Sequence, residues 1–284
     1  MDESVLEQPK RDPAKPTTKE CPPFVGYRSW IFVSHSHKDF EAVRKVRNAL
    51  EERGHFPLLF FLRCLTDESE LESLLRREIE ARDFFLLCNS ENAADSRFVA
   101  EEVNYIKSLA GKIYETVDLD SNWEAQIEAI KALSRRATVY LSYSAEDYAT
   151  AGDVAAALAQ RDFKIEGLDH SLKAGDEPRA AAERGILEAL EYGFVIVLLS
   201  SSAVSRPVSF QWLELHITNE LSMRFAPGRV RVIPVIWSDY EAVTQWMEAN
   251  DLDRIHPLDL SRVDRNERAD RIVEFLLEAA RGDG

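Results

Sequence analysis

The chain contains nearly the same strand and turn twice. The first copy reads WIFVSHSHKDF over residues 30–40, and the second reads TVYLSYSAEDY over residues 138–148. A shift of 108 positions superposes Ser34 on Ser142, Ser36 on Ser144, Asp39 on Asp147, Leu50 on Leu158 and Arg53 on Arg161. This period is far too long for a solenoid, so the repeat predicts two copies of one domain in tandem.

Length and charge narrow the class of protein. A chain of 284 residues with 45% hydrophobic content is long enough for two domains with real cores. The net charge of −15 would repel a phosphate backbone, which argues against nucleic acid as a partner. No apolar run approaches the roughly 20 residues that cross a bilayer, and residues 1–20 lack the apolar stretch of a signal peptide. We therefore expect a cytoplasmic protein that does not enter a membrane.

Cysteine and histidine usage argues against disulfides and metals. Cys21, Cys64 and Cys88 are too few for a disulfide framework and lack the close pairing of a zinc site. His35 and His37 stand close together, but no clear carboxylate or thiolate set accompanies them. We expect reduced thiols and no metal.

The N-terminal half has the pattern of a parallel sheet. Residues 1–26 mix Pro, Lys, Glu and Thr with little apolar content, which predicts a flexible tail. Beyond the tail, apolar runs alternate with amphipathic helical patterns, which is typical of a parallel sheet with helices on both faces. The runs cover residues 30–33, 56–62, 84–88 and 112–117. We expect a first domain of four strands over residues 27–134.

The C-terminal half repeats the pattern over residues 135–284, where we expect five strands. Its apolar runs cover residues 139–141, 194–199 and 230–237, followed by the short strand candidate HPLDL and a closing helix over about 264–280. The first domain ends in the helix NWEAQIEAIKAL and reaches the second through only SRRA. Such a short link should hold the two domains in contact.

These motifs, in this order, resemble the Toll/interleukin-1 receptor (TIR) domain family. The resemblance lies in the segments FVSHSHKD, YLSYSAED, GLDHSLKAGD, FFLLCNS, FVIVLLS and RVIPVIW, and it covers nearly everything beyond the tail. It implies an α/β fold of two flavodoxin-like domains with strand order 2-1-3-4-5, truncated in the first copy. It leaves two functional classes open, because some TIR domains only bind other TIR domains and others cleave NAD+ at the nicotinamide-ribose bond.

Topology places a candidate site in the first copy. Ligands bind beyond the carboxyl ends of parallel strands where the strand order reverses, here between strands 1 and 3. The loops 34–39 and 90–96 should converge there, next to the helix RFVAEEVNYIKSL. Helical spacing puts Glu102 at the edge of the inward stripe, where it is either partly desolvated or an ordinary boundary residue reaching water. The resemblance favours a catalytic Glu102, because the family pattern has an aromatic residue, here Phe98, four positions before the glutamate.

Further residues are expected to bind substrate around Glu102. They are His35, Ser36 and Asp39 from the first loop, Ser96 and Phe98 from the third, and Arg63, Cys64 and Leu65, which stand where the family has a mobile loop. That last segment lacks the usual glycine, which departs from the family pattern. Structural alternatives remain open at this point: Ser36 or Asp39 would cap the following helix, and Phe98 would be part of the core.

The second copy departs from the catalytic pattern. In SFQWLELHITNEL, His216 stands four residues beyond Trp212, and Glu214 is two positions out of register. A shift of two residues turns a helical side chain by about 200°, so Glu214 cannot substitute. We expect a non-catalytic domain that orients the first and completes its pocket within an assembly. Its loop HSLKAGDE is either a TIR-to-TIR contact or an ordinary surface turn.

The resemblance implies an NAD+ glycohydrolase or ADP-ribosyl cyclase that acts in bacterial antiphage immunity. NAD+ would be the substrate, no cofactor would be needed, and other TIR domains would be partners. The main alternative is a non-catalytic scaffold that docks TIR proteins. A third interpretation is a relative of nucleoside-processing enzymes, which also cleave N-glycosidic bonds with a carboxylate.

Overall fold

The computed structural model describes residues 29–60, 68–167, 193–205, 231–250, 252 and 256–282. Several sequence-based expectations fall outside these ranges. They are the tail over residues 1–26, the substrate-binding candidates Arg63, Cys64 and Leu65, the loop HSLKAGDE at 170–177, and His216 with its neighbours Trp212 and Glu214. They stay predictions.

The first sheet has four parallel strands in the order β2-β1-β3-β4. Its strands are β1 (Trp30–Ser34), β2 (Phe56–Leu58), β3 (Phe84–Asn89) and β4 (Ile113–Asp118). The edge strand β2 is shorter than the expected run over residues 56–62, because it pairs with only three residues of β1. Phe60 therefore lies beyond the strand, where its ring packs 5.8 Å from that of Phe32.

The second sheet has five parallel strands in the order β6-β5-β7-β8-β9. Its strands are β5 (Thr138–Ser142), β6 (Lys164–Glu166), β7 (Gly193–Leu199), β8 (Arg231–Ile236) and β9 (Leu258–Asp259). Both sheets thus follow the order 2-1-3-4-5, with the last strand missing from the first among the described residues. The expected fold class of two flavodoxin-like units is confirmed.

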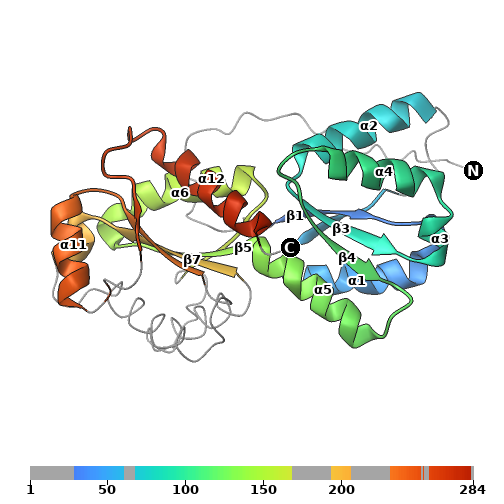
Figure 1. Cartoon of the computed structure of the whole chain (residues 1–284), viewed down its shortest axis with the longest axis horizontal. Helices are drawn as coiled ribbons and strands as arrows, with labels where there is room; N and C mark the ends of the chain where they lie inside the picture. Colours follow the sequence, from blue (N-terminus) through green and yellow to red (C-terminus); the bar gives the residue numbers. More distant parts are fainter. Residues whose placement is uncertain are drawn as a thin grey trace, which may run out of the picture.

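Helices cover both faces of the first sheet (Figure 1). The helices α1 (Phe40–Glu52) and α5 (Trp123–Arg136) pack on one face, and α2 (Glu68–Ala81) and α4 (Arg97–Ser108) on the other. The apolar stripe of α1 is buried. The chain leaves the helix through Gly54, whose φ of 77° is readily adopted by a residue without a Cβ. A short 3-10 turn η1 (His37–Asp39) and the helix α3 (Glu91–Ala94) follow β1 and β3.

The second sheet carries α6 (Tyr148–Gln160) and α12 (Arg268–Arg281), which pack against each other. Short elements η3 (Ala145–Asp147), α9 (Ser201–Val204) and α11 (Tyr240–Ala249) follow β5, β7 and β8. The closing helix begins four residues later than expected, because residues 264–267 form turns. In the parts of the chain that are described, we find no helix with the length and hydrophobicity required to traverse a lipid bilayer.

The junction between the two units is tighter than the sequence predicts. Three of the four expected linker residues form the last turn of α5, which ends at Arg136, and β5 begins at Thr138. The Arg136 guanidinium holds this turn in place by donating to the Tyr114 carbonyl and to the Glu115 carboxylate, each at 2.7 Å. The helix therefore runs almost directly into the first strand of the second sheet.

Apolar and charged contacts bind the two units together. Phe84 at the start of β3 and Phe163 directly before β6 pack edge to face, 5.1 Å between ring centres, within a core shared by both units. Beside them, two Arg-Asp dipeptides pair reciprocally. The Arg161 guanidinium donates to both oxygens of Asp83, at 2.7 and 2.8 Å, and Arg82 lies 3.1 Å from Asp162. The expected contact between the domains is confirmed.

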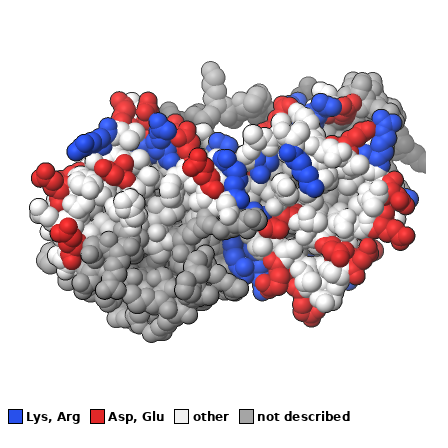
Figure 2. Space-filling model, viewed as in Figure 1, with Lys and Arg blue, Asp and Glu red and all other residues white. Residues whose placement is uncertain are grey.

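These contacts all lie at the amino-terminal ends of the strands. The carboxyl ends of the two sheets consequently face away from each other, and α3 and α11, which follow β3 and β8, lie at opposite ends of the molecule (Figure 1). Lys and Arg side chains gather along the junction on one face of this otherwise acidic protein (Figure 2). The described part of the second unit therefore does not reach the carboxyl end of the first sheet of its own chain.

Arg161→Ala should destabilise the fold more than loss of an ordinary surface arginine. Asp83 is buried, with an 8% exposed side chain, and the substitution would remove its bidentate partner. Because Arg161 is itself half exposed, we expect a loss of about 2 kcal/mol in the free energy of unfolding. Urea denaturation of the wild type, of Arg161→Ala and of the matched control Arg47→Ala measures the loss in the free energy of unfolding.

The control removes an exposed pair, in which Arg47 lies 2.8 Å from Glu51 one helical turn away. Exposed pairs of this kind contribute little to stability, because water screens them. Equal losses for Arg161→Ala and Arg47→Ala would show that the reciprocal pairing does not stabilise the junction.

Candidate functional site

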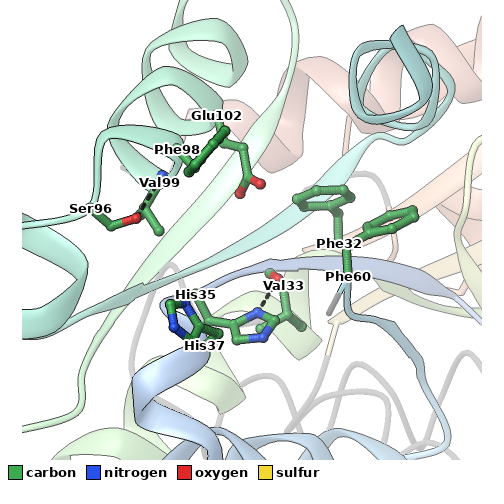
Figure 3. Close-up of a pocket in the computed structure, with 9 residues that line it drawn as sticks. All are labelled: Phe32, Val33, His35, His37, Phe60, Ser96, Phe98, Val99 and Glu102. Carbon is green, nitrogen blue, oxygen red and sulfur yellow. Dashed lines mark hydrogen bonds between the residues drawn. The ribbon is translucent and has the colours of Figure 1, made fainter. Parts of the chain in front are cut away.

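The carboxylate of Glu102 is held at the carboxyl end of β1. Ser96 begins α4 as its N-cap, accepting a hydrogen bond from the Val99 amide, and the helix then carries Glu102 over the sheet. The buried Ser34 hydroxyl, on the last residue of β1, donates to Glu102 Oε2 at 2.7 Å. Figure 3 shows the Glu102 carboxylate directed from α4 toward the space above β1. The side chain does not point into bulk solvent.

Burial dominates the electrostatics of this carboxylate. Desolvation raises the pKa of Glu102 from its ordinary value of 4.5 to about 7, while the hydrogen bond from Ser34 lowers it. Burial is the larger effect, and among the described residues no cation offsets it. Both the protonated and the ionised forms of Glu102 are therefore populated near neutral pH.

A small hollow of about 70 Å³ lies in front of Glu102 (Figure 3). Its walls come from the end of β1, the turn after it, the residues beyond β2, and the first turns of α4. The lining residues are Phe32, Val33, His35, His37, Phe60, Ser96, Phe98, Val99 and Glu102. The structure thus brings His35, Ser96, Phe98 and Glu102 together as the sequence predicts.

His35 forms a polar wall of the hollow. Its Nδ1 lies 3.0 Å from the Val33 carbonyl, which only accepts, so Nδ1 carries the proton that is donated. Burial lowers the pKa of His35, more than the hydrogen bond to the Val33 carbonyl and the nearby Asp39 raise it. The imidazole therefore stays neutral at physiological pH.

Asp39 has a different role from the one expected. Its carboxylate accepts from the Ser90 hydroxyl at 2.5 Å and from the Asn92 side-chain amide at 2.6 Å. It thereby ties the loop after β1 to the loop after β3, and it does not line the hollow. The capping alternative is wrong as well, because its side chain makes no cap hydrogen bond to α1. Asp39 positions the two loops.

The second copy repeats this clamp. Asp147, the counterpart of Asp39, accepts from the Ser200 hydroxyl at 2.5 Å and from the Ser144 hydroxyl at 2.6 Å. The serines at the ends of β3 and β7 also cap the short helices that follow them. Because the clamp occurs in both copies, it belongs to the frame of the fold.

The structure answers the other open alternatives. Ser36 accepts from the Lys38 amide at 3.4 Å, so it caps the 3-10 turn, and it does not line the hollow. Phe98 is 42% exposed, so its assignment to the core is wrong. It stands at the mouth of the hollow beside Glu102.

Sequence reasoning missed several residues of this site. The sequence places Ser34 only in the first loop, although the last residue of a strand at the switch point is well placed to meet a ligand. The apolar run over residues 56–62 predicts Phe60 in a strand, and no sequence signal shows that it leaves β2. His37 stands out in the sequence only as a possible metal ligand. Within the described ranges, the structure contains no group of three or more His, Cys, Asp or Glu side chains suited to a metal.

Glu102→Gln should stabilise the protein at high pH. Glu102 is ionised above pH 4.5 in the unfolded chain but only above about pH 7 in the fold, so the wild type loses stability as pH rises through this window. The amide keeps an oxygen that accepts from Ser34 and carries no charge. We expect a gain of up to about 3 kcal/mol at pH 8, since one pKa unit corresponds to 1.36 kcal/mol.

Thermal or urea unfolding at pH 8 and pH 4.5 measures this difference, with Glu124→Gln as an exposed control on α5. At pH 4.5 the gain of Glu102→Gln should largely disappear. An equal gain in the free energy of unfolding at both pH values would show that the ionisation of buried Glu102 is not its cause.

Comparisons with solved structures return relatives of low identity. A putative two-component response regulator/GGDEF domain protein is similar at 13% identity and TM-score 0.33, covering 89% of this chain and 99% of the other. The XylFII molecule is similar at 12% identity and TM-score 0.23, with coverage of 90% and 94%. A LacI transcriptional regulator from Lactobacillus brevis is similar at 13% identity and TM-score 0.22, with coverage of 81% and 95%. The comparison with curated proteins gives no match.

The family comparison covers most of the chain. The model of the TIR domain matches residues 31–132 and, a second time, residues 139–275. The two matches coincide with the two parallel sheets, which begin at Trp30 and Thr138. The chain therefore belongs to the TIR domain family and carries two such domains in tandem.

Proposed function

We propose that the first TIR domain cleaves NAD+ at the bond between nicotinamide and ribose, with Glu102 as the catalytic residue. The observation that carries the proposal is the Glu102 carboxylate, desolvated at the carboxyl end of β1, held by Ser34 and facing a hollow. A carboxylate of this kind, in a cleft and with a perturbed pKa, is a candidate for a catalytic group.

The reaction requires little beyond this carboxylate. When the glycosidic C–N bond breaks, its electron pair moves onto the positively charged nicotinamide ring, which leaves as a neutral molecule. No acid has to protonate the leaving group, in contrast to most glycoside hydrolyses. The ionised Glu102 stabilises the positive charge that develops on the ribose and orients the sugar by accepting from its hydroxyl groups. Water then adds to the anomeric carbon and releases a proton, which gives ADP-ribose.

The remaining lining suits the same substrate. The exposed ring of Phe98 and the ring of Phe60 offer apolar and π surface to the flat, cationic nicotinamide group. The neutral imidazole of His35 adds no positive charge that would oppose substrate binding. NAD+ acts here as the substrate and no further cofactor is invoked. An internal nucleophile in place of water would give a cyclic product, and a role in antiphage immunity stays a prediction.

A second candidate function, docking of other TIR domains, is favoured by one observation. Phe40 and Tyr148 occupy equivalent positions in the two copies and are 47% and 46% exposed. Each aromatic ring directly follows a clamp aspartate, so the pair stands near the two opposite ends of the molecule. Exposed aromatic residues are common at protein interfaces. A chain without NAD+ cleavage would therefore act as a bivalent connector between TIR proteins.

Glu102→Gln should abolish release of nicotinamide from NAD+. The amide keeps the size of the side chain and the hydrogen bond from Ser34 but cannot become negative, so a loss of at least about 100-fold is expected. Chromatography of nicotinamide after incubation with NAD+ measures the rate. Glu124→Gln and, in the second copy, His216→Ala are the controls that should keep wild-type rates. Wild-type release by Glu102→Gln would exclude the assignment.

The pH profile should report the ionisation of Glu102. Because the reaction uses the ionised form, kcat/KM should rise with pH and level off above about 7. The hydrogen bond from Ser34 lowers this pKa, so Ser34→Ala should move the rising limb to higher pH, and Ser34→Thr should restore it. Steady-state rates between pH 5 and 9 measure both effects. If kcat/KM of Ser34→Ala rises at the same pH as that of the wild type, Ser34 does not influence the ionisation of Glu102.

A further inference from the structure

A second and larger hollow adjoins the site. It is a groove of about 710 Å³ between α2 and α4, and Phe98 and Glu102 line both this groove and the small hollow. Glu102 therefore stands where the two spaces meet. The wall of the groove on the α2 side includes Leu75 and Ile79, and Tyr105 stands on the α4 side.

The sizes of the two spaces constrain how a dinucleotide would bind. Pockets that enclose ligands of drug size measure about 300–1,000 Å³, so the hollow of about 70 Å³ cannot hold NAD+ as a whole. The groove has a suitable volume. We propose that the groove between α2 and α4 binds the ADP half of the dinucleotide while the nicotinamide end enters the small hollow, an inference that rests on the proposed function.

The aromatic chemistry of the groove suits a purine. The Tyr105 hydroxyl donates to Glu80, and the Arg76 guanidinium lies 4.8 Å from the centre of the Tyr105 ring. These contacts hold the ring in place on the groove wall. A flat base can stack on such a ring or on the guanidinium plane without a sequence-specific hydrogen bond. Leu75 and Ile79 form the floor beneath the groove and are themselves buried, 7% and 1% exposed, so Tyr105 and Arg76 carry the contact with a base.

The charged side chains of the groove can receive a diphosphate. Arg76 and Arg97 are 55% and 87% exposed, and each pairs at 2.7 Å with a glutamate of its own helix, Glu72 or Glu101. Exposed pairs one helical turn apart are weak. Guanidinium groups bind phosphate oxygens with short, charge-assisted and often bidentate hydrogen bonds, which can displace such pairs. The two arginines stand on opposite helices, so they approach the groove from both sides.

Blocking the groove far from Glu102 tests the proposal. Ser108 lines the groove at the end of α4, is exposed, and donates to the Tyr105 carbonyl at 2.7 Å. Ser108→Trp should lower kcat/KM for NAD+ about tenfold or more, as expected for the loss of one stacked base. It should leave kcat/KM for nicotinamide mononucleotide, which lacks the adenosine half, nearly unchanged. Tyr105→Ala should likewise lower kcat/KM for NAD+ but not for nicotinamide mononucleotide.

The matched control is Ser205→Trp in the second domain. Ser205 is also exposed, follows a helix, and donates to a carbonyl three residues back, at 3.0 Å. Ser205→Trp should leave kcat/KM unchanged for both substrates. Equal losses on NAD+ and nicotinamide mononucleotide in the groove variants would overturn the proposal while leaving the cleavage reaction intact.

A binding measurement separates failure of the groove from failure of the reaction. If the wild type releases nicotinamide from neither substrate, the proposed function fails. Calorimetry with ADP alone then tests whether the groove binds the ADP half independently of the reaction. ADP binding to the wild type that is lost in Ser108→Trp and kept in Ser205→Trp would support the groove. Absence of ADP binding to the wild type would overturn it.

Discussion

The direct passage from α5 into β5 fixes the architecture of the molecule. The crossover helix that follows β4 runs antiparallel to the strands, so it ends at the amino-terminal edge of the first sheet, and β5 begins there after a single intervening residue. The second sheet has to start from the same place and extend away from the first. The shared core around Phe84 and Phe163 and the reciprocal Arg-Asp pairing follow from this geometry. Among the residues that the structure describes, each carboxyl edge, where ligands bind in such sheets, is clear of the other domain.

Within that frame, the candidate site depends on an opposition between burial and hydrogen bonding at Glu102. Packing α4 onto β1 removes the carboxylate from water and raises its pKa, and Ser34 counters only part of this effect. The fold therefore carries a destabilising charge at the position where the reaction would develop a positive one. An arriving cationic substrate would favour ionisation of Glu102 just when the carboxylate is needed. A site that costs stability in its free form is common where function depends on a charged group.

The sequence predicts the frame better than the site, for a physical reason. The strands and the helix faces follow from the hydrophobic period, which the repeat displays twice, whereas the strand order is implied by the resemblance to the TIR family. Helical spacing puts Glu102 at the edge of the inward stripe, and the resemblance selects it as catalytic. Side-chain partners depend on how loops from distant segments meet, which no period encodes. The sequence therefore predicts Asp39 and Ser36 as substrate-binding residues, whereas in the structure they hold the loops themselves. Phe60 reaches the hollow only because β2 ends at Leu58, after pairing with three residues of β1.

The repeat itself offers a way to separate structural from chemical residues. Asp39 and Ser34 have the counterparts Asp147 and Ser142, and the aspartate forms the same clamp in both copies. His35 and His37 instead correspond to Tyr143 and Ala145, so the polar wall of the hollow is peculiar to the first copy. A residue that makes the same contact in both copies, as Asp39 and Asp147 do, serves the shared fold. Ser34 shares its position with Ser142 but is set apart by its hydrogen bond to Glu102, which lines the hollow of the first copy together with His35 and His37.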